Sequence, residues 1–293
     1  MSFVFRGILF SIISASIFGL MPLFAKYVYA DGCSATGLVF VRMASGSIIL
    51  FFLAKQHGSN PMDISWEQFK KILLLSLGFA PTPVLLYESY NYISTGAATT
   101  IHFVYPAFAF LLCWAFYKEK IERMQLLSLI LCTTGVTLFY KPGDDSSLFG
   151  VAIAFLSGIT YAFYAVYLAK SGLKSTEKFW MNFHMNWVSA LMVLVVSVPL
   201  GNFSLPSSAF GWGIGLLFGV LMTVIAGVLF QLGINYIGPQ QATIFSTFEP
   251  LTSVVVGVLF LNEHLDLLSL AGIVIILLAV LLLIVADKRS KNS

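Results

Sequence analysis

Charged side chains are scarce in this 293-residue chain. Only 10% of its residues are Asp, Glu, Lys or Arg, whereas 58% are hydrophobic and the mean hydropathy is +0.91. A soluble domain carries about 25% charged residues, so the composition excludes a soluble enzyme as well as a disordered chain. Ten helices of about 21 residues would leave about 83 residues for loops and tails, too few for a soluble domain. The chain is therefore predicted to be a polytopic membrane protein.

Residues typical of metal and catalytic sites are equally sparse. The three cysteines are odd in number and scattered, which supports neither a disulfide framework nor a metal site. The sequence contains no Gly-x-Ser-x-Gly or His-Glu-x-x-His motif, and no cluster of acids such as lipid-phosphate chemistry would need. We therefore expect no enzyme, no catalytic residues, no metal and no cofactor.

Ten apolar segments are long enough to be considered as transmembrane helices. The first follows the N-terminus directly and is too long for the core of a signal peptide, so we interpret it as a retained span. The third and fourth spans are almost continuous in sequence. The predicted spans cover residues 7–27, 34–54, 72–92, 94–117, 124–140, 148–169, 179–198, 209–235, 240–261 and 268–286.

The distribution of basic residues gives the orientation of these spans. With the N-terminus in the cytoplasm, 13 of the 16 lysines and arginines fall in cytoplasmic segments, and only Lys26 and Lys141 fall in outer ones. A missed helix would reverse every later loop, so this asymmetry supports ten spans with both termini cytoplasmic. We expect a multi-pass protein of the plasma (cytoplasmic) membrane, in contact with the lipid bilayer. Topology explains the basic loops, so no nucleic-acid partner is expected.

The two halves of the chain resemble each other. A unit of five helices ends on the opposite side of the membrane from its start, so two such copies are inverted relative to each other. Inverted repeats are typical of secondary transporters. The predicted repeats are residues 1–145 and 146–293. Aligned pairs include, at an offset of 144, Asn91-Tyr92-Ile93 with Asn235-Tyr236-Ile237, Pro106 with Pro250 and Glu119 with Glu263, and, at an offset of 143, Gly7 with Gly150 and Ser14 with Ser157.

Three stretches of the chain carry a family resemblance: TGAATTIHFVYPAFAFLLCWAFYKEKIERMQLLSLILCTTGV, QATIFSTFEPLTSVVVGVLFLNEHLDLLSLAGIVII and Phe40-Val41-Arg42. They resemble the drug/metabolite transporter superfamily, in particular its EamA-type branch of ten-helix proteins. The prolines of the fourth and ninth spans, and Glu119 and Glu263 at their ends, are marks of that family. The resemblance implies a carrier of small metabolites, often amino acids and their derivatives, with a central cavity between the halves. Glu88 and His102 fall outside the family pattern, so the resemblance assigns them no role.

Two prolines at equivalent positions of the halves mark the predicted substrate site. Pro106 lies near the middle of the fourth span, and Pro250 near the middle of the ninth. A proline within a helix removes one hydrogen bond and frees the carbonyl four residues earlier, here at His102 and Ser246. Paired interruptions point to the binding site of a transporter and to its gating; the alternative is that each proline only bends its helix. Further bends are suggested by Pro22, Pro81 and Pro83.

Polar side chains within the spans complete the predicted site, because ionisable groups are costly in hydrocarbon and mark function there. His102 could relay a proton or bind a polar substrate, since imidazole titrates near neutral pH; a structural histidine is the alternative. Glu249 is predicted either to line the cavity or to support the bend at Pro250. Glu88 either pairs with Arg42 or binds a substrate ammonium group. The predicted substrate-binding residues are Glu88, His102, Tyr105, Tyr161, Ser246 and Glu249.

These features predict a secondary transporter that moves a small polar or zwitterionic metabolite, such as an amino acid or a related compound, by alternating access. Proton coupling through Glu88, His102 or Glu249 and exchange are the two alternatives for the driving force. A channel-like or non-transporting membrane protein is the second interpretation, because inverted repeats occur in channels too. The missing catalytic motifs argue against an intramembrane enzyme. The sequence does not specify the substrate, the direction of transport or the oligomeric state.

Overall fold

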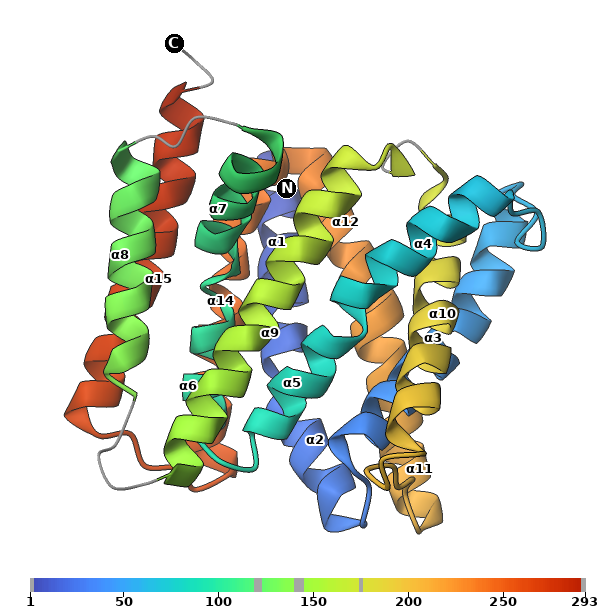
Figure 1. Ribbon diagram of the computed structural model, residues 1–293, viewed down its shortest axis with the longest axis horizontal. Helices are drawn as coiled ribbons and strands as arrows, with labels where there is room; N and C mark the ends of the chain where they lie inside the picture. Colours follow the sequence, from blue (N-terminus) through green and yellow to red (C-terminus); the bar gives the residue numbers. More distant parts are fainter. Residues whose placement is uncertain (1–2, 119–122, 140–144, 174–175, 291–293) are drawn as a thin grey trace. The chain divides into compact units, whose positions relative to one another are not determined.

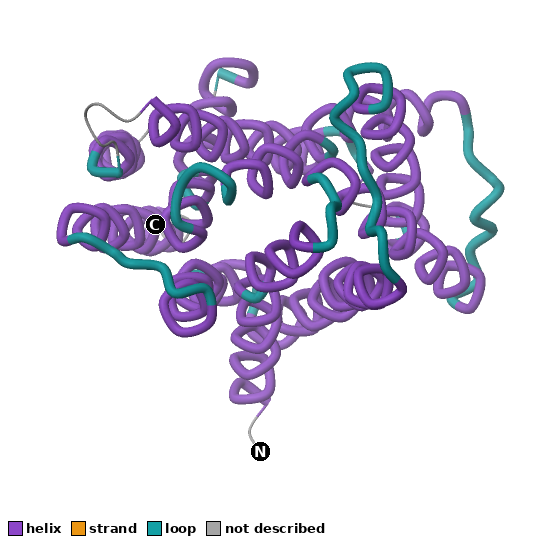
Figure 2. Tube along the Cα trace, turned by 90° about the horizontal axis from the view of Figure 1, so that it is seen from below, coloured by secondary structure: helices purple, strands orange, loops and turns teal. Residues whose placement is uncertain are grey.

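The computed structural model describes residues 3–118, 123–139, 145–173 and 176–290, and all regular secondary structure in these ranges is helical (Figure 1). Figure 2 shows the same helices as a backbone trace, with the described loops in teal. In chain order the elements are α1 (Phe3–Gly19), α2 (Met21–Ala30), α3 (Ala35–Gln56), α4 (Trp66–Phe79), α5 (Pro81–Ser89), α6 (Thr95–His102), α7 (Tyr105–Tyr117), α8 (Arg123–Thr137), α9 (Asp145–Lys170), α10 (Lys178–Ser197), α11 (Ala209–Gly219), the π-helical turn η2 (Val220–Ile225), α12 (Ala226–Ile237), α13 (Pro239–Ser246), α14 (Phe248–Phe260) and α15 (Leu267–Ser290).

These helices account for the ten predicted spans. Among the described residues, seven helical stretches are long and apolar enough to cross a membrane, and Ile244–Phe260 and Leu267–Leu282 are shorter apolar helices. The 15-residue helix α8 occupies the position of the predicted fifth span. The all-helical membrane fold is thereby confirmed, although the helix ends differ by a few residues from the predicted boundaries: α1 begins at Phe3 and α9 at Asp145.

In the described part of the chain, five of the ten spans are interrupted within their length. Breaks separate α1 from α2, α4 from α5, α6 from α7 and α13 from α14, and the turn η2 separates α11 from α12. A proline lies within four residues after each of the first four breaks, where its ring would clash with an uninterrupted helix. The fifth interruption has no proline: it is a π-helical turn, in which extra residues widen the helix locally.

The chain forms two compact units, each built from both halves of the sequence. Unit 1 comprises Met1–Leu23, Leu85–Ala162 and Ala226–Ser293, and unit 2 comprises Phe24–Val84 and Phe163–Ile225. Because each unit combines segments that are far apart in sequence, native packing joins the two halves within each unit.

Unit 1 contains helix crossings that repeat between the two halves of the chain. In this unit, α1 packs against α12, α13 and α14. A Cβ atom on Gly7 of α1 would lie 2.6 Å from side-chain atoms of both Tyr236 and Ile237. A Cβ atom on Gly150 of α9 would lie 2.7 and 2.9 Å from side-chain atoms of Tyr92 and Ile93, which are the equivalent residues of the other half. Glycine at both positions lets the helices approach more closely than any side chain would permit.

Small residues also allow a close crossing of α8 and α15, in unit 1. Ser128 of α8 donates a hydrogen bond to the carbonyl of Ala279 in α15. A Cβ atom on Gly272 of α15 would lie 3.0 Å from the carbonyl oxygen of Gly135 in α8. At an offset of 144, Ser128 corresponds to Gly272 and Gly135 to Ala279. Small residues at equivalent positions therefore bring the fifth and tenth spans together.

Unit 2 is organised around α3 and α10. Helix α10 packs against α3 and α4, and α11 and η2 also pack against α3. Its core includes the buried side chains of Ile72, Leu75, Met185 and Val188. These residues come from α4 and α10, so the core lies where these two helices meet.

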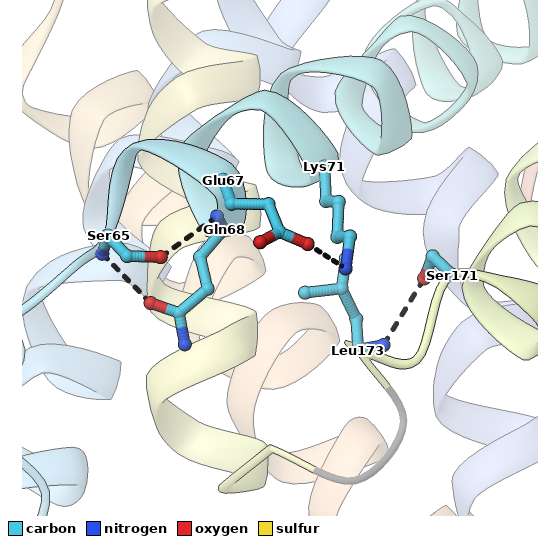
Figure 3. Close-up of polar contacts among 6 residues, drawn as sticks. All are labelled: Ser65, Glu67, Gln68, Lys71, Ser171 and Leu173. Atoms are coloured by element: carbon cyan, nitrogen blue, oxygen red, sulfur yellow. Dashed lines mark hydrogen bonds and ion pairs between the residues drawn. The ribbon is translucent and has the colours of Figure 1, made fainter.

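Loops of unit 2 are fixed by polar contacts at helix ends. The backbone N–H of Ser208, which caps α11, donates to Asp31 Oδ2 at 2.9 Å. Hydrogen bonds from Ser208 hold the pKa of Asp31 below its ordinary value of 3.8. At α4, Ser65 and Gln68 form a reciprocal capping box, and Lys71 pairs with Glu67 at 2.9 Å (Figure 3). Such caps satisfy backbone N–H groups that the first turn of a helix leaves without partners.

Candidate functional site

The fourth span is interrupted directly before Pro106. Helix α6 ends at His102 and α7 begins at Tyr105, with Pro106 in the first turn of α7, where its missing N–H leaves no bond unmade. The carbonyl of His102 faces α9: a Cβ atom on Gly158 would lie 2.9 Å from this oxygen. Glycine at this position therefore allows the backbone of α9 to reach the interruption.

The ninth span is interrupted at the equivalent place. Helix α13 ends at Ser246 and α14 begins at Phe248, two residues before Pro250. A Cβ atom on Gly19 of α1 would lie 2.7 Å from the carbonyl oxygen of Glu249. The fourth and ninth spans are thus each approached, at their interruptions, by a glycine from the first helix of the opposite half. This helix is α9 for the fourth span and α1 for the ninth.

Three of the predicted site residues meet beside the first interruption. The rings of Tyr105 and Tyr161 are 4.6 Å apart, and the ring of His102 lies 5.8 Å from that of Tyr105 and 5.4 Å from that of Tyr161. His102 Nδ1 is 2.9 Å from Ser157 Oγ. His102 and Ser157 are buried, whereas the two tyrosines are partly exposed. We call these four residues the His102 cluster.

Ser157 is the member of the His102 cluster that the sequence analysis did not name as a site residue. The available signal was its alignment with Ser14, which makes it a repeated polar position inside an apolar span. Ser14 is also buried, and its hydroxyl donates to the carbonyl of Ala226 at 2.8 Å. Both serines therefore satisfy polar groups on a neighbouring helix, but only Ser157 contacts an ionisable side chain.

Glu249 places a carboxyl group near the His102 cluster. Its carboxylate lies close enough to Tyr105 and Tyr90 to interact electrostatically with both. Tyr105 is the residue that corresponds to Glu249 in the other half. The two equivalent positions that follow the interruptions are therefore near each other, one carrying a phenol and the other a carboxylate.

A chain of hydroxyl groups runs along α6 behind the His102 cluster. Tyr90 Oη is 3.4 Å from Thr99 Oγ1, which is 3.0 Å from Ser253 Oγ, and Ser253 donates to the carbonyl of Thr95 at 3.3 Å. All four residues are buried. Sequence reasoning missed this chain because threonine and serine occur throughout apolar helices and give no distinctive pattern.

Two predicted site residues use their polar groups locally. Glu88 accepts a hydrogen bond from Tyr92 Oη at 3.3 Å, within the same turn of chain. Ser246 donates to the carbonyl of Ala242 in its own helix at 3.3 Å. Their roles in substrate binding stay predictions. Across the described part of the chain, no three His, Cys, Asp or Glu side chains are grouped as a metal site would require.

The sequence and the structure are similar to those of several known proteins. The model of the EamA-like transporter family matches residues 5–141 and, a second time, residues 148–285. An uncharacterized transporter of Synechocystis sp. is 32% identical over 220 residues, which cover 72% of this chain and 66% of that protein. An uncharacterized transporter of Bacillus subtilis is 24% identical over 288 residues, or 96% of this chain and 90% of that protein.

Two further similarities concern an exporter and a solved structure. The pseudopaline exporter of Pseudomonas aeruginosa is 24% identical over 278 residues, covering 93% of this chain and 94% of that protein. One crystal structure of another protein has a TM-score of 0.65 at 10% sequence identity, over 96% of this chain and 98% of that chain, and supports the fold alone. The double match to the family model confirms the ten-helix, two-repeat architecture inferred from the sequence.

Proposed function

Because this chain belongs to the EamA-like transporter family, we propose that it is a secondary transporter that carries a small polar or zwitterionic metabolite, such as an amino acid or a related compound. The observation that carries this proposal is the pair of equivalent interrupted helices, one of which presents the His102 cluster. Interrupted helices in corresponding positions of two repeats are the arrangement from which transporters build substrate sites.

The chemistry of the His102 cluster fits a small substrate with an ammonium group and hydrogen-bonding capacity. Tyr105 and Tyr161 offer π faces that attract a cation, and Glu249 supplies a negative charge nearby. Ser157 Oγ donates to the carbonyl of Ala154 and lies 2.9 Å from His102 Nδ1. The imidazole of His102 can donate to a polar substrate or accept from it, depending on its tautomer. Few charges lie in this region, so a polyanionic substrate is disfavoured.

Transport by alternating access would use the two interruptions as points of bending. Pro106 and Pro250 keep the helices from closing into continuous hydrogen-bonded spans, so a change of angle there breaks few backbone bonds. We propose a gating role for both prolines, with the two repeats, residues 1–145 and 146–293, exchanging their conformations. The proposed location is the cytoplasmic membrane with both termini in the cytoplasm, as the basic loops indicate.

Proton coupling is proposed through the pair formed by His102 and Ser157, with Glu249 as a second ionisable group close to Tyr105. A histidine bonded to a hydroxyl in a membrane interior can gain and lose a proton as the surroundings change. In proteoliposomes, uptake should then depend on an imposed pH gradient, and His102→Gln should abolish that dependence. Uptake that is indifferent to the gradient in the wild-type protein would remove coupling from the proposal while leaving transport intact.

The test of the substrate site begins with purified protein and a thermal-shift screen of amino acids, amines, nucleobases and vitamins, because a bound ligand raises the unfolding temperature. A compound that shifts the transition is then assayed for saturable uptake and counter-flow. Tyr161→Leu removes one π face from the cluster, whereas Tyr27→Leu removes one from an exposed tyrosine of α2 and serves as the control.

We expect Tyr161→Leu to raise KM about three- to tenfold, the range that follows from one lost cation–π contact, and Tyr27→Leu to leave KM unchanged. Counter-flow by the wild-type protein would distinguish a carrier from a pore. Equal kinetics for both variants and the wild type would exclude the His102 cluster as the substrate site.

A further inference from the structure

Glu263 makes an unusual set of contacts at the start of α6. The backbone N–H of Thr95 donates to both carboxylate oxygens of Glu263 at 2.9 Å, and Thr95 Oγ1 donates to Glu263 Oε2 at 3.1 Å. Thr95 is fully buried, and the N-cap residue of α6, Ser94, makes no capping bond with its own side chain. The cap of α6 is thus supplied by a residue 168 positions later in the sequence.

The backbone turn after α14 places the Glu263 carboxylate next to Thr95. Asn262 has a positive φ of 53°, and the N–H of Glu263 turns back to the carbonyl of Gly257 at 2.9 Å. A Cβ atom on Gly257 would lie 2.3 Å from Glu263 Oε2. Any side chain at residue 257 would therefore occupy the space that the carboxylate needs. Both features, a left-handed turn and a glycine, serve to fold Glu263 back onto α6.

The second half of the chain cannot make the same bond. The residue equivalent to Thr95 is Pro239, which begins α13 and has no backbone N–H to donate. Lys118, equivalent to Asn262, also has a positive φ of 55°, while Glu119, equivalent to Glu263, lies outside the described residues. The fourth and ninth spans, which are interrupted at equivalent places, therefore differ in whether their first helical residue has a backbone N–H to donate.

We propose that Glu263 is a positioning residue of the transport site: by capping α6, it holds His102, at the other end of this helix, against Ser157 and Tyr161. The inference rests on the proposed function. Helix α6 has only eight residues, about 12 Å, so it contains few internal hydrogen bonds and depends on contacts at its two ends. A carboxylate that accepts N–H bonds at a helix N-terminus is favoured by both hydrogen bonding and the helix dipole.

The connection between the two ends of α6 is continuous. Thr95, which Glu263 caps, also accepts a hydrogen bond from Ser253, and Ser253 contacts Thr99 one turn further along α6. Loss of the cap would therefore loosen the first turn and the hydroxyl chain together. His102, three residues after Thr99, would then lose its fixed distance to Ser157.

The experiment measures the environment of His102 directly. Diethyl pyrocarbonate reacts with accessible imidazoles, and mass spectrometry of peptides separates His102 from His184, a second buried histidine that lies in unit 2. The full-length protein in nanodiscs is compared with Glu263→Gln, which removes the charge and one acceptor, and with Gly257→Ala, which displaces the carboxylate without removing it. Glu67→Gln, the same change at an exposed carboxylate of α4, is the matched control.

We expect modification of His102 to become roughly tenfold faster in Glu263→Gln and Gly257→Ala, because a charge-assisted bond is lost, with His184 unchanged and Glu67→Gln equal to the wild type. For a compound transported by the wild type, KM should rise in both variants while the maximal rate changes by less than about twofold.

Three outcomes would overturn the inference: no change at His102, faster reaction at both histidines, which indicates general loosening, or faster reaction at His102 with unchanged KM. Failure of the proposed function itself would be seen differently, as no uptake by the wild type. The labelling of His102 does not depend on a substrate, so it still reports whether Glu263 holds α6.

Discussion

Replacing Gly158 by alanine tests whether the backbone of α9 really contacts the interruption of the fourth span. The added methyl group would lie 2.9 Å from the carbonyl oxygen of His102 and 3.0 Å from Val104 Cγ2. The oxygen belongs to the backbone, so it cannot move without shifting the end of α6. Overpacking of this kind costs about 1–3 kcal/mol.

A glycine with free space around it serves as the reference for the overpacking cost at Gly158. Gly213 of α11 is exposed, and a Cβ atom there would meet nothing within 4 Å. Gly213→Ala should therefore stabilise the protein by about 0.5–1 kcal/mol, the ordinary gain from alanine in a helix. Gly158→Ala gains the same helix propensity, so the difference in unfolding free energy between the two variants is the overpacking cost alone, about 1–3 kcal/mol in favour of Gly213→Ala.

Tryptophan fluorescence during titration with a denaturing detergent gives both unfolding free energies in the same mixed micelles. Gly19→Ala places a methyl group 2.7 Å from the carbonyl oxygen of Glu249 at the interruption of the ninth span. Its unfolding free energy should be lower than that of Gly213→Ala, as for Gly158→Ala. If Gly158→Ala were as stable as Gly213→Ala, the close approach of α9 to His102 would be wrong, and with it the geometry of the His102 cluster.

Two further predictions concern the helix caps of unit 2. Hydrogen bonds with Ser208 lower the pKa of Asp31 in the folded protein, so the ionised carboxylate stabilises the fold above its ordinary pKa of 3.8, and this stabilisation is lost as the pH falls through the lowered pKa. At pH 6 the wild type should therefore have a higher melting temperature than Asp31→Asn, and the two melting temperatures should converge on acidification. A difference in melting temperature that stays constant with pH would contradict this prediction. Ser65→Ala removes half of the capping box with Gln68 and should cost about 0.5–2 kcal/mol in unfolding free energy, measured in the same titration; an unchanged free energy would mean that the cap contributes nothing.

Hydropathy alone was sufficient to predict the ten spans, because a helix in lipid must be apolar along a length set by the bilayer. The matched prolines were equally informative, since proline acts on its own helix whatever surrounds it. The interruptions before Pro106 and Pro250 therefore lie where the sequence suggested. The π-helical turn at Val220–Ile225 was not predicted, because it contains no proline and depends on packing against α3.

The candidate site was only partly predictable for a related reason. His102, Tyr105 and Tyr161 stand out in an apolar sequence, and the structure brings them together. The contact of His102 with Ser157 and the cap that Glu263 provides depend on which helices are neighbours across the two halves. In a single sequence, the neighbours of a helix are indicated only by small residues at repeated positions. Such residues show that another helix can approach closely, but they do not show which helix it is.

The packing of α1 also has a consequence for biosynthesis. This helix leaves the ribosome about 200 residues before α12, α13 and α14, against which it packs. While the middle of the chain is being inserted, the polar face of α1 that contains Ser14 has not yet met the carbonyl of Ala226. Unit 1 can therefore close only after α12, α13 and α14 have been synthesised, and a ribosome that stalls before them would leave a half-built bundle for membrane quality control to recognise.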